Sequence, residues 1–258
     1  MKTFLFELCG ESLEAAKAAE TGGVDRIELC AELRIGGVTP DFDLAKATVE
    51  AISIPVYVLI RPRGGDFVYS AEEFDCMRRQ IERAREAGAQ GVVLGILLAD
   101  GRVDVERTRS LVQQARPMRV TFHRAFDEAQ NLSEALEAVI DTGADCLLTS
   151  GGAPDVLKGA ETIAQLAQQA GERIQIMAGG GLWLGDLAEV MRRSGVTHLH
   201  GSLTRRKQVQ NRAGKAALLE SDVREAVRVM REAAAKQVPA ASFYSGVSAY
   251  ACRYLERS

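Results

Sequence analysis

The stretch TGGVDRIELC at residues 21–30 decides the fold, because its design recurs along the chain. The related stretches are AGAQGVVLG at 87–95, TGADCLLTS at 142–150 and SGVTHLHGS at 194–202. Each begins with a glycine of the kind that ends a helix, continues through a short polar step, and becomes an apolar strand that closes in polar or small residues. A repeated helix-to-strand junction of this kind is typical of a barrel built from strand–helix units.

The remaining sequence completes eight such units. We expect strands at 4–9, 25–30, 55–61, 91–97, 118–124, 145–149, 173–178 and 197–202, with helices between them. A length of 258 residues suits a single barrel. Because no GxGxxG follows the first strand, an open doubly wound sheet is the less favoured alternative. The sequence therefore predicts a (β/α)₈ (TIM) barrel.

The barrel is predicted to occupy residues 1–237 as one domain. Residues 203–218 are expected to form a long basic loop, and residues 221–237 the last helix. The tail at 238–258 has no clear place in a barrel and is expected to pack outside it or to be disordered. Two helix starts are also expected: a capping box at Ser70 and Glu73, and a cap at Thr39 before Pro40.

Composition excludes several classes of partner. A net charge of −3 and a pI near 5.8 argue against nucleic acid or an anionic membrane. No apolar run approaches the ~20 residues of a spanning helix, and Glu7 interrupts the apolar start before it resembles a signal peptide. The five cysteines are scattered, without a CxxC pair, which is typical of reduced thiols. We therefore expect a cytoplasmic protein.

Alternation along the strands predicts which polar side chains point into the barrel. The inward set at the carboxyl ends of the strands consists of Glu7, Glu28, Arg61, Arg63, His123, His200 and Ser202. Barrel active sites are assembled at these ends, so Glu7, Glu28, Arg61 and His123 are the candidate catalytic residues. Any one of them could instead be half of an internal ion pair that fixes the barrel.

Glycine-rich strand ends indicate an anionic ligand. The strand at 173–178 runs into Gly179, Gly180 and Gly181, where backbone amides can approach a ligand closely. With Arg63, Ser150, His200 and Ser202 they form the candidate set for binding a small carboxylate or phosphate. A tight bend is the alternative role for these glycines.

Several strings together resemble the CutC family, which is named for copper homeostasis. They are FELC at 6–9, DRIELC at 25–30, GGVTP at 36–40, IRPRGGDFVYS at 60–70, TFHRAFD at 121–127, LTSGG at 148–152 and IMAGGG at 176–181. The resemblance runs over roughly residues 4–202. It implies a cytoplasmic barrel that is commonly a homo-oligomer (a dimer or tetramer) and that binds or traffics Cu(I). The family's proposed copper ligands fall on Cys9 and Cys30.

Three functions stay open from the sequence. The first is a copper homeostasis protein that holds Cu(I) on the two thiolates, which are soft ligands suited to that ion. The second is an enzyme (a lyase, isomerase or hydrolase) acting on a small anionic metabolite, with no organic cofactor, which would use the arginines and His123 that copper does not need. The third is a redox-sensing pair at Cys9 and Cys30, which neighbouring glutamates disfavour by raising thiol pKa values.

Overall fold

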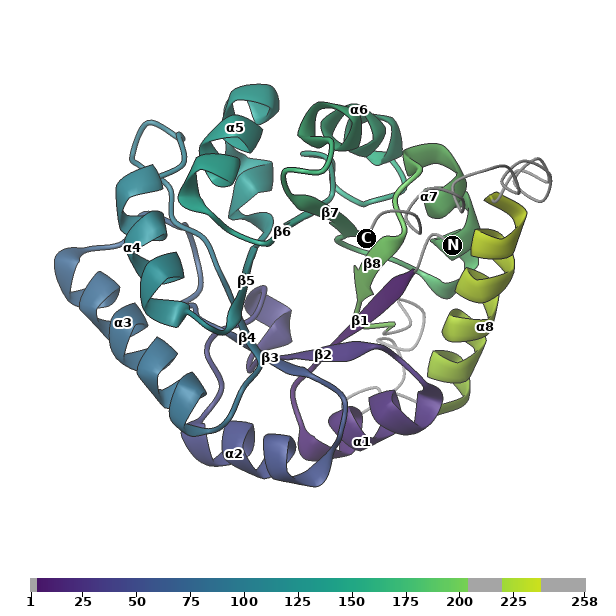
Figure 1. The fold of residues 1–258 in the computed structure, drawn as a ribbon, viewed down its shortest axis with the longest axis horizontal. Coiled ribbons are helices and arrows are strands. Elements are labelled where there is room, and N and C mark those ends of the chain that lie inside the picture. Colours follow the sequence, from purple (N-terminus) through teal and green to yellow (C-terminus); the bar gives the residue numbers. More distant parts are fainter. Residues whose placement is uncertain (1–3, 204–219, 238–258) are drawn as a thin grey trace, which may run out of the picture.

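The computed structural model describes residues 4–203 and 220–237, and in this part the strands form a closed parallel barrel in chain order (Figure 1). The strands are β1 (Leu5–Gly10), β2 (Arg26–Leu29), β3 (Val56–Leu59), β4 (Gly91–Leu94), β5 (Arg119–Phe122), β6 (Cys146–Thr149), β7 (Gln175–Gly179) and β8 (His198–Gly201). Since β8 also pairs with β1, the barrel has no edge strand. The predicted (β/α)₈ architecture is confirmed.

A ring of helices surrounds the barrel. Its members are α1 (Leu13–Gly22), α2 (Phe42–Ala51), α3 (Ala71–Glu86), α4 (Val105–Ala115), α5 (Leu132–Thr142), α6 (Ala160–Ala170), α7 (Leu187–Ser194) and α8 (Glu220–Gln237). Three short 3₁₀ helices interrupt the connections: η1 (Leu33–Ile35), η2 (Arg124–Glu128) and η3 (Leu184–Asp186). In Figure 1, α8 lies between α7 and α1 and closes the ring.

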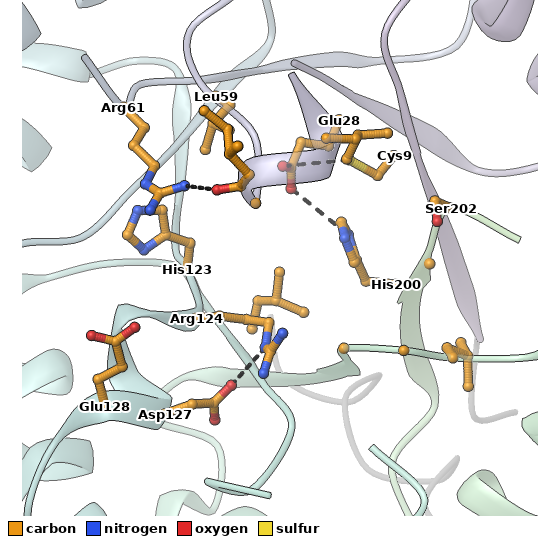
Figure 2. A pocket seen from close by; sticks show the side chains of 18 of the residues that line it. Cys9, Glu28, Leu59, Arg61, His123, Arg124, Asp127, Glu128, His200 and Ser202 are labelled. Atoms are coloured by element: carbon orange, nitrogen blue, oxygen red, sulfur yellow. Dashed lines mark hydrogen bonds and ion pairs between the residues drawn. The ribbon is translucent and has the colours of Figure 1, made fainter. Parts of the chain in front are cut away.

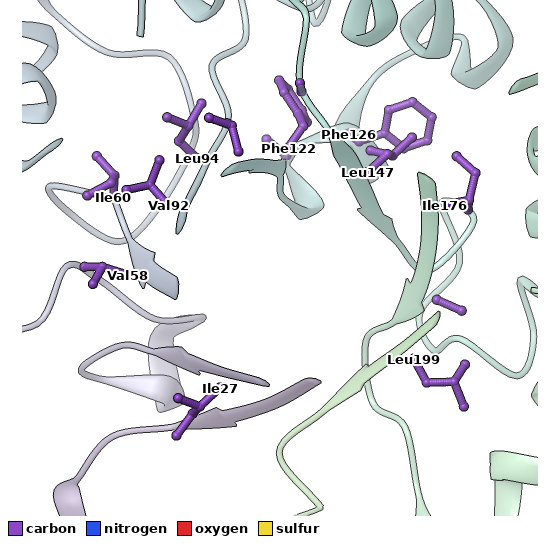
Figure 3. Close-up of a cluster of buried hydrophobic side chains, with 14 of the residues drawn as sticks. Ile27, Val58, Ile60, Val92, Leu94, Phe122, Phe126, Leu147, Ile176 and Leu199 are labelled. Carbon is purple, nitrogen blue, oxygen red and sulfur yellow. The ribbon is translucent and has the colours of Figure 1, made fainter. Parts of the chain in front are cut away.

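Alternation along each strand separates two apolar regions. The outward side chains, among them Ile27, Val58, Leu94 and Phe122, are buried between the barrel and the helices (Figure 3). Inside the barrel, one cluster contains Cys9, Cys30, Tyr57, Leu59 and Val93, and another contains Cys146, Leu148 and Met177. The outer layer therefore holds the helices in place, and the inner residues fill the barrel below the carboxyl ends of the strands.

The helix-to-strand junctions form as the repeated glycines predict. Gly23 ends α1 with a φ of 85°, and Gly143 ends α5 with a φ of 82°. Glycine adopts this left-handed conformation without a Cβ clash, so the chain reverses at once and enters the next strand. The short junctions keep successive strands adjacent.

Of the two predicted helix starts, one prediction is confirmed and the other is wrong. Ser70 and Glu73 form both hydrogen bonds of a capping box at the start of α3. Thr39, by contrast, does not cap α2, which begins at Phe42. Its hydroxyl accepts a hydrogen bond from the Arg61 backbone amide (2.8 Å) and donates one to Gln80. Thr39 therefore fixes the chain at the end of β3.

The last helix begins at Glu220, one residue before its predicted start. The expected loop at 203–218, apart from Leu203, and the tail at 238–258 lie outside the described residues. Within residues 4–203 and 220–237, no helix combines the length and the hydropathy that crossing a bilayer requires.

Candidate functional site

A cavity of about 800 Å³ opens at the carboxyl ends of the strands (Figure 2). The residues predicted for the site that line it are Cys9, Glu28, Arg61, His123, Gly180, Gly181, His200 and Ser202. They come from β1, β2 and β8 and from the segments that follow β3, β5, β7 and β8. The alternation of side chains in the strands thus brings most of the expected residues to one place. Glu7, Cys30, Arg63, Ser150 and Gly179 do not line the cavity.

Glu7 lies below the cavity and is fully buried. Its carboxylate forms an ion pair with Arg26, its neighbour in the β1–β2 register, and accepts a hydrogen bond from Nδ1 of His200 at 2.7 Å. Burial alone would raise the pKa of Glu7, but the Arg26 guanidinium and the His200 imidazole outweigh it and lower the pKa. Glu7 is therefore a buried anion that orients His200.

Glu28 has different surroundings, although it is also buried. Burial, together with the charge on Glu7, raises the pKa of Glu28 to about 7 against the opposing effect of His200. Its Oε2 has no hydrogen-bond partner among the described residues, while its Oε1 lies 3.8 Å from the Cys9 sulfur. Glu28 can exchange a proton near neutral pH, and its free oxygen is available to a ligand.

Cys9, Glu28 and His200 offer one ligand atom each, and these atoms all lie within 4.8 Å of one another. Burial would lower the pKa of His200, but Glu28 and Glu7 raise it overall. Because the ionised Glu7 carboxylate can only accept, Nδ1 of His200 carries the proton that joins them, and Nε2 is the nitrogen that would bind a metal when the ring is neutral. A histidine that donates to a carboxylate in this way is common at metal centres.

The thiols of Cys9 and Cys30 are adjacent at the same end of the cavity. Their sulfurs lie 3.5 Å apart, both side chains are buried, and neither forms a disulfide. The hydrogen bond shared with Cys30, burial and the charge of Glu28 raise the pKa of Cys9 well above its usual range. Cys9 is thus a neutral thiol in the absence of a cation, and it lines the cavity, whereas Cys30 does not.

Arg61 and Arg63 differ although alternation predicts the same direction for both. Arg61 is buried, lines the cavity and donates to the backbone carbonyls of Ile35, Gly37 and Gly65. Arg63 instead points away from the cavity.

Both residues follow β3, which ends at Leu59, so alternation within the strand fixes neither of them, and their hydrogen-bond partners decide where each side chain lies. The Arg63 guanidinium forms ion pairs with Asp66 and Glu73. The structure therefore does not bring Arg63 to the anion-binding position expected from the sequence.

His123 is buried in the cavity wall at the end of β5. Burial, and then the charge of Arg61, lowers the pKa of His123 to about 3, so the ring is neutral at physiological pH. Its Nδ1 accepts a hydrogen bond from the Ala125 amide, which leaves the proton on Nε2. Nε2 has no partner among the described residues. His123 is consequently a hydrogen-bond donor toward the cavity and a weak base.

The glycines at the end of β7 are favoured by close packing and, at Gly180, by a φ of 112°. A Cβ on Gly180 would lie 2.8 Å from Cζ of Arg124, and one on Gly179 would lie 2.7 Å from Leu148. The hydroxyl of Ser150, also expected to contact an anion, is instead hydrogen-bonded to Asp127 and to the Ala153 carbonyl. Gly180 and Gly181 therefore line the cavity, whereas Ser150 and Gly179 pack behind the residues that line it.

Arg124, Asp127 and Glu128 line the cavity but were not among the candidates. All three lie in the 3₁₀ helix η2. The alternation of side chains in a strand does not apply there, so it cannot predict where these side chains point. Asp127 accepts from both hydroxyls and one amide of Thr149 and Ser150, and it pairs with Arg124. The string FHRAFD contained Arg124 and Asp127, so the signal was present in the sequence.

The fold and this cavity define a barrel protein that binds a ligand at the carboxyl ends of its strands, beside a buried pair of thiols. The chain belongs to the CutC family, whose model matches residues 4–205. A CutC protein of Chromobacterium violaceum is 44% identical over 92% of this chain and 96% of its own length. The human copper homeostasis protein cutC homolog is 44% identical over 77% of this chain and 73% of its own.

A solved structure agrees with this assignment. The crystal structure of a CutC protein from Streptococcus agalactiae superposes with a TM-score of 0.74 at 30% sequence identity. It covers 78% of this chain and 99% of the crystallised one. The resemblance expected from the sequence strings is confirmed.

Proposed function

We propose that this protein binds Cu(I) on Cys9 and Cys30 and serves copper homeostasis. The observation that carries the proposal is the pair of free sulfurs 3.5 Å apart at one end of the cavity. Thiolates are soft ligands that favour Cu(I), as well as Zn²⁺, over hard cations. The human relative, at 44% identity, is named a copper homeostasis protein cutC homolog, which supports the same function here.

The donor set fits a copper ion with a third ligand. Two sulfurs on opposite sides of one ion would be about 4.6 Å apart, from metal–sulfur distances of about 2.3 Å, which is more than the separation in this structure. A bent arrangement therefore leaves room for His200, whose Nε2 is available. Imidazole is also a good copper ligand. Glu7, which holds Nδ1 of His200, would orient that ligand.

Bound copper would replace the protons of the thiols. While no cation is present, the buried Cys9 side chain stays a neutral thiol, because Cys30 and Glu28 both raise its pKa. A cation at this position would reverse that balance and release protons on binding. The same raised pKa argues against the redox-sensing hypothesis, which needs a reactive thiolate.

We also propose that the protein acts in the cytoplasm. We propose further that it assembles as a homo-oligomer, either a dimer or a tetramer. The free thiols at Cys9, Cys30, Cys76 and Cys146 favour a reducing compartment. Light scattering on the purified chain measures its assembly state directly.

The test is an anaerobic titration of the reduced protein with Cu(I) against a competing chelator. We expect one ion per chain, bound tightly, and loss of that binding in the Cys9→Ser/Cys30→Ser double variant. Cys146→Ser is the matched control, because this buried thiol also lies inside the barrel but belongs to another cluster. Binding that survives in the double variant, or that is lost equally in Cys146→Ser, would contradict the proposal.

The enzyme hypothesis depends on the cavity alone, since the names of the relatives given above state no reaction. Glu28, with a pKa of about 7, is the one predicted catalytic residue poised to exchange protons at neutral pH.

Zn²⁺ is the alternative ion for a Cys–Glu–His set. A parallel titration with Zn²⁺ separates it from Cu(I).

A further inference from the structure

Arg61 is a buried cation without a counterion. Its side chain lines the cavity, the residue is only 5% exposed, and its guanidinium donates to three backbone carbonyls. Among the described residues, no carboxylate forms an ion pair with it, although it acts at longer range on Asp66 and Glu128. The nearby Tyr69 phenol stays neutral, because burial raises its pKa to about 12. Burying an uncompensated charge is costly.

The Nε–H of Arg61 has no hydrogen-bond partner in normal geometry within the described part of the chain, although the Tyr69 hydroxyl interacts with the same guanidinium. A second unpartnered donor, Nε2–H of His123, lies in the same wall. The ring of Phe67 contacts both residues: the Arg61 guanidinium carbon lies 4.7 Å and the His123 ring 4.9 Å from its centre. Two orphaned N–H groups at one side of a cavity indicate an acceptor that a ligand supplies.

Figure 2 shows Arg61 and His123 together on one side of the cavity and Cys9, Glu28 and His200 on another. The two groups therefore form separate ends of one space. Copper has no use for the Arg61 end, since a guanidinium and a protonated ring nitrogen cannot bind a cation. Some other molecule has to account for that end.

We propose that the Arg61–His123 end of the cavity binds the carboxylate group of a small organic acid. One unpaired positive charge and one neutral donor match a monoanion with two acceptor oxygens. A phosphate dianion fits less well, because Glu128 also lines the cavity and would repel the second charge, while Arg124 is already paired with Asp127. A volume of about 800 Å³ is in the range of small-molecule sites. This ligand goes beyond copper binding and does not depend on it.

The experiment measures binding to the full-length, metal-free chain by calorimetry and by ligand-observed NMR. The probes are acetate, lactate, pyruvate, malate and citrate, with inorganic phosphate as the competing anion. We expect at least one carboxylate to bind with a dissociation constant below about 1 mM, as for ordinary metabolite affinities. Stronger binding of phosphate than of every carboxylate, or the absence of any binding, would overturn the proposal.

Three variants assign the binding to these residues. His123→Asn keeps an acceptor for the Ala125 amide, but its shorter side chain does not place a donor where Nε2–H lies, so affinity should fall at least about tenfold, as expected for a lost charge-assisted or buried hydrogen bond. Arg61→Gln should do the same. Arg63→Gln removes an equal charge outside the cavity and should leave binding unchanged.

Equal losses in Arg63→Gln would show a general effect of charge and would overturn the site. Since Arg61 also fixes the loops at 35–37 and 65, His123→Asn decides the outcome if Arg61→Gln folds poorly. The Cys9→Ser/Cys30→Ser variant separates the two proposals: it should lose Cu(I) and keep the carboxylate.

Discussion

His123 shows how burial fixes the chemistry of a single residue. Its ring is neutral because burial and Arg61 lower its pKa to about 3, whereas an unfolded chain restores a value near 6.5. The unfolded state therefore binds a proton below pH 6.5 that the folded state does not bind until about pH 3. Stability due to this residue is present above pH 6.5 and is lost as the pH falls toward 3.

Replacing His123 with Asn should remove that pH dependence. Between pH 7 and pH 4 the parent protein should lose on the order of 3 kcal/mol of unfolding free energy more than His123→Asn, from 1.36 kcal/mol per unit of pKa shift. Urea unfolding at several pH values measures the difference. Parallel curves for the two proteins would show that the ring is not held neutral.

Glu7 is a buried anion whose removal leaves Arg26 without its partner. Glu7→Gln should therefore lower the unfolding free energy by about 3–5 kcal/mol, the usual cost of breaking a buried pair from one side. Glu189→Gln, which breaks the exposed pair with Arg192, should cost less than about 1 kcal/mol. Urea unfolding compares the two variants, and similar costs would contradict the role given to Glu7.

At the scale of elements, η2 supports one wall of the cavity. Asp127 is the acceptor for the hydroxyls and amides at the end of β6, including the Gly152 amide at 3.1 Å. Removing it leaves buried donors unpaired and releases Arg124.

Asp127→Ala should therefore destabilise the protein by about 2–4 kcal/mol, more than one ordinary hydrogen bond, because several donors lose their acceptor together. Asp100→Ala, at an exposed turn where the carboxylate accepts hydrogen bonds from Arg102, should cost less than about 1 kcal/mol. Thermal unfolding of both variants tests this, and an equal loss would show that η2 does not brace the wall.

The strands were predictable because their signals are local. A helix-ending glycine and an apolar run specify each junction, and alternation inside a strand gives the direction of Glu28 and Cys9. Prediction was less accurate beyond the ends of the strands, where Arg61 and His123 line the cavity as expected but Arg63 does not. Arg63 lies beyond β3, and Arg124 and Asp127 lie in a 3₁₀ turn. Their positions depend on tertiary contacts, such as the contact between Asp127 and the end of β6. Such contacts leave no periodic pattern in the sequence.

At the scale of the whole molecule, the proposed copper ligands join the beginning and the end of the barrel. Cys9 and Cys30 belong to β1 and the end of β2, and His200 belongs to β8. A bound ion would therefore add a link where the chain closes on itself, and ligand binding to the native state alone stabilises it by mass action.

Loading with Cu(I) should raise the melting temperature of the entire barrel. Free metal at 100 times the dissociation constant adds about 2.7 kcal/mol, which corresponds to about 5–10 °C for a chain of this size. Removal of copper by a chelator should reverse the shift, and the Cys9→Ser/Cys30→Ser variant should not show it. Scanning calorimetry under anaerobic conditions gives the answer; a metal-independent melting temperature would contradict specific loading.

The central claim is that copper is held by the sulfurs of Cys9 and Cys30, and X-ray absorption at the copper edge tests it most directly. For the reduced, Cu(I)-loaded protein we predict two sulfur ligands at about 2.2–2.3 Å, in the range of metal–thiolate bonds, with one nitrogen from His200. A spectrum with only nitrogen and oxygen ligands, unchanged in the double cysteine variant, would contradict the account.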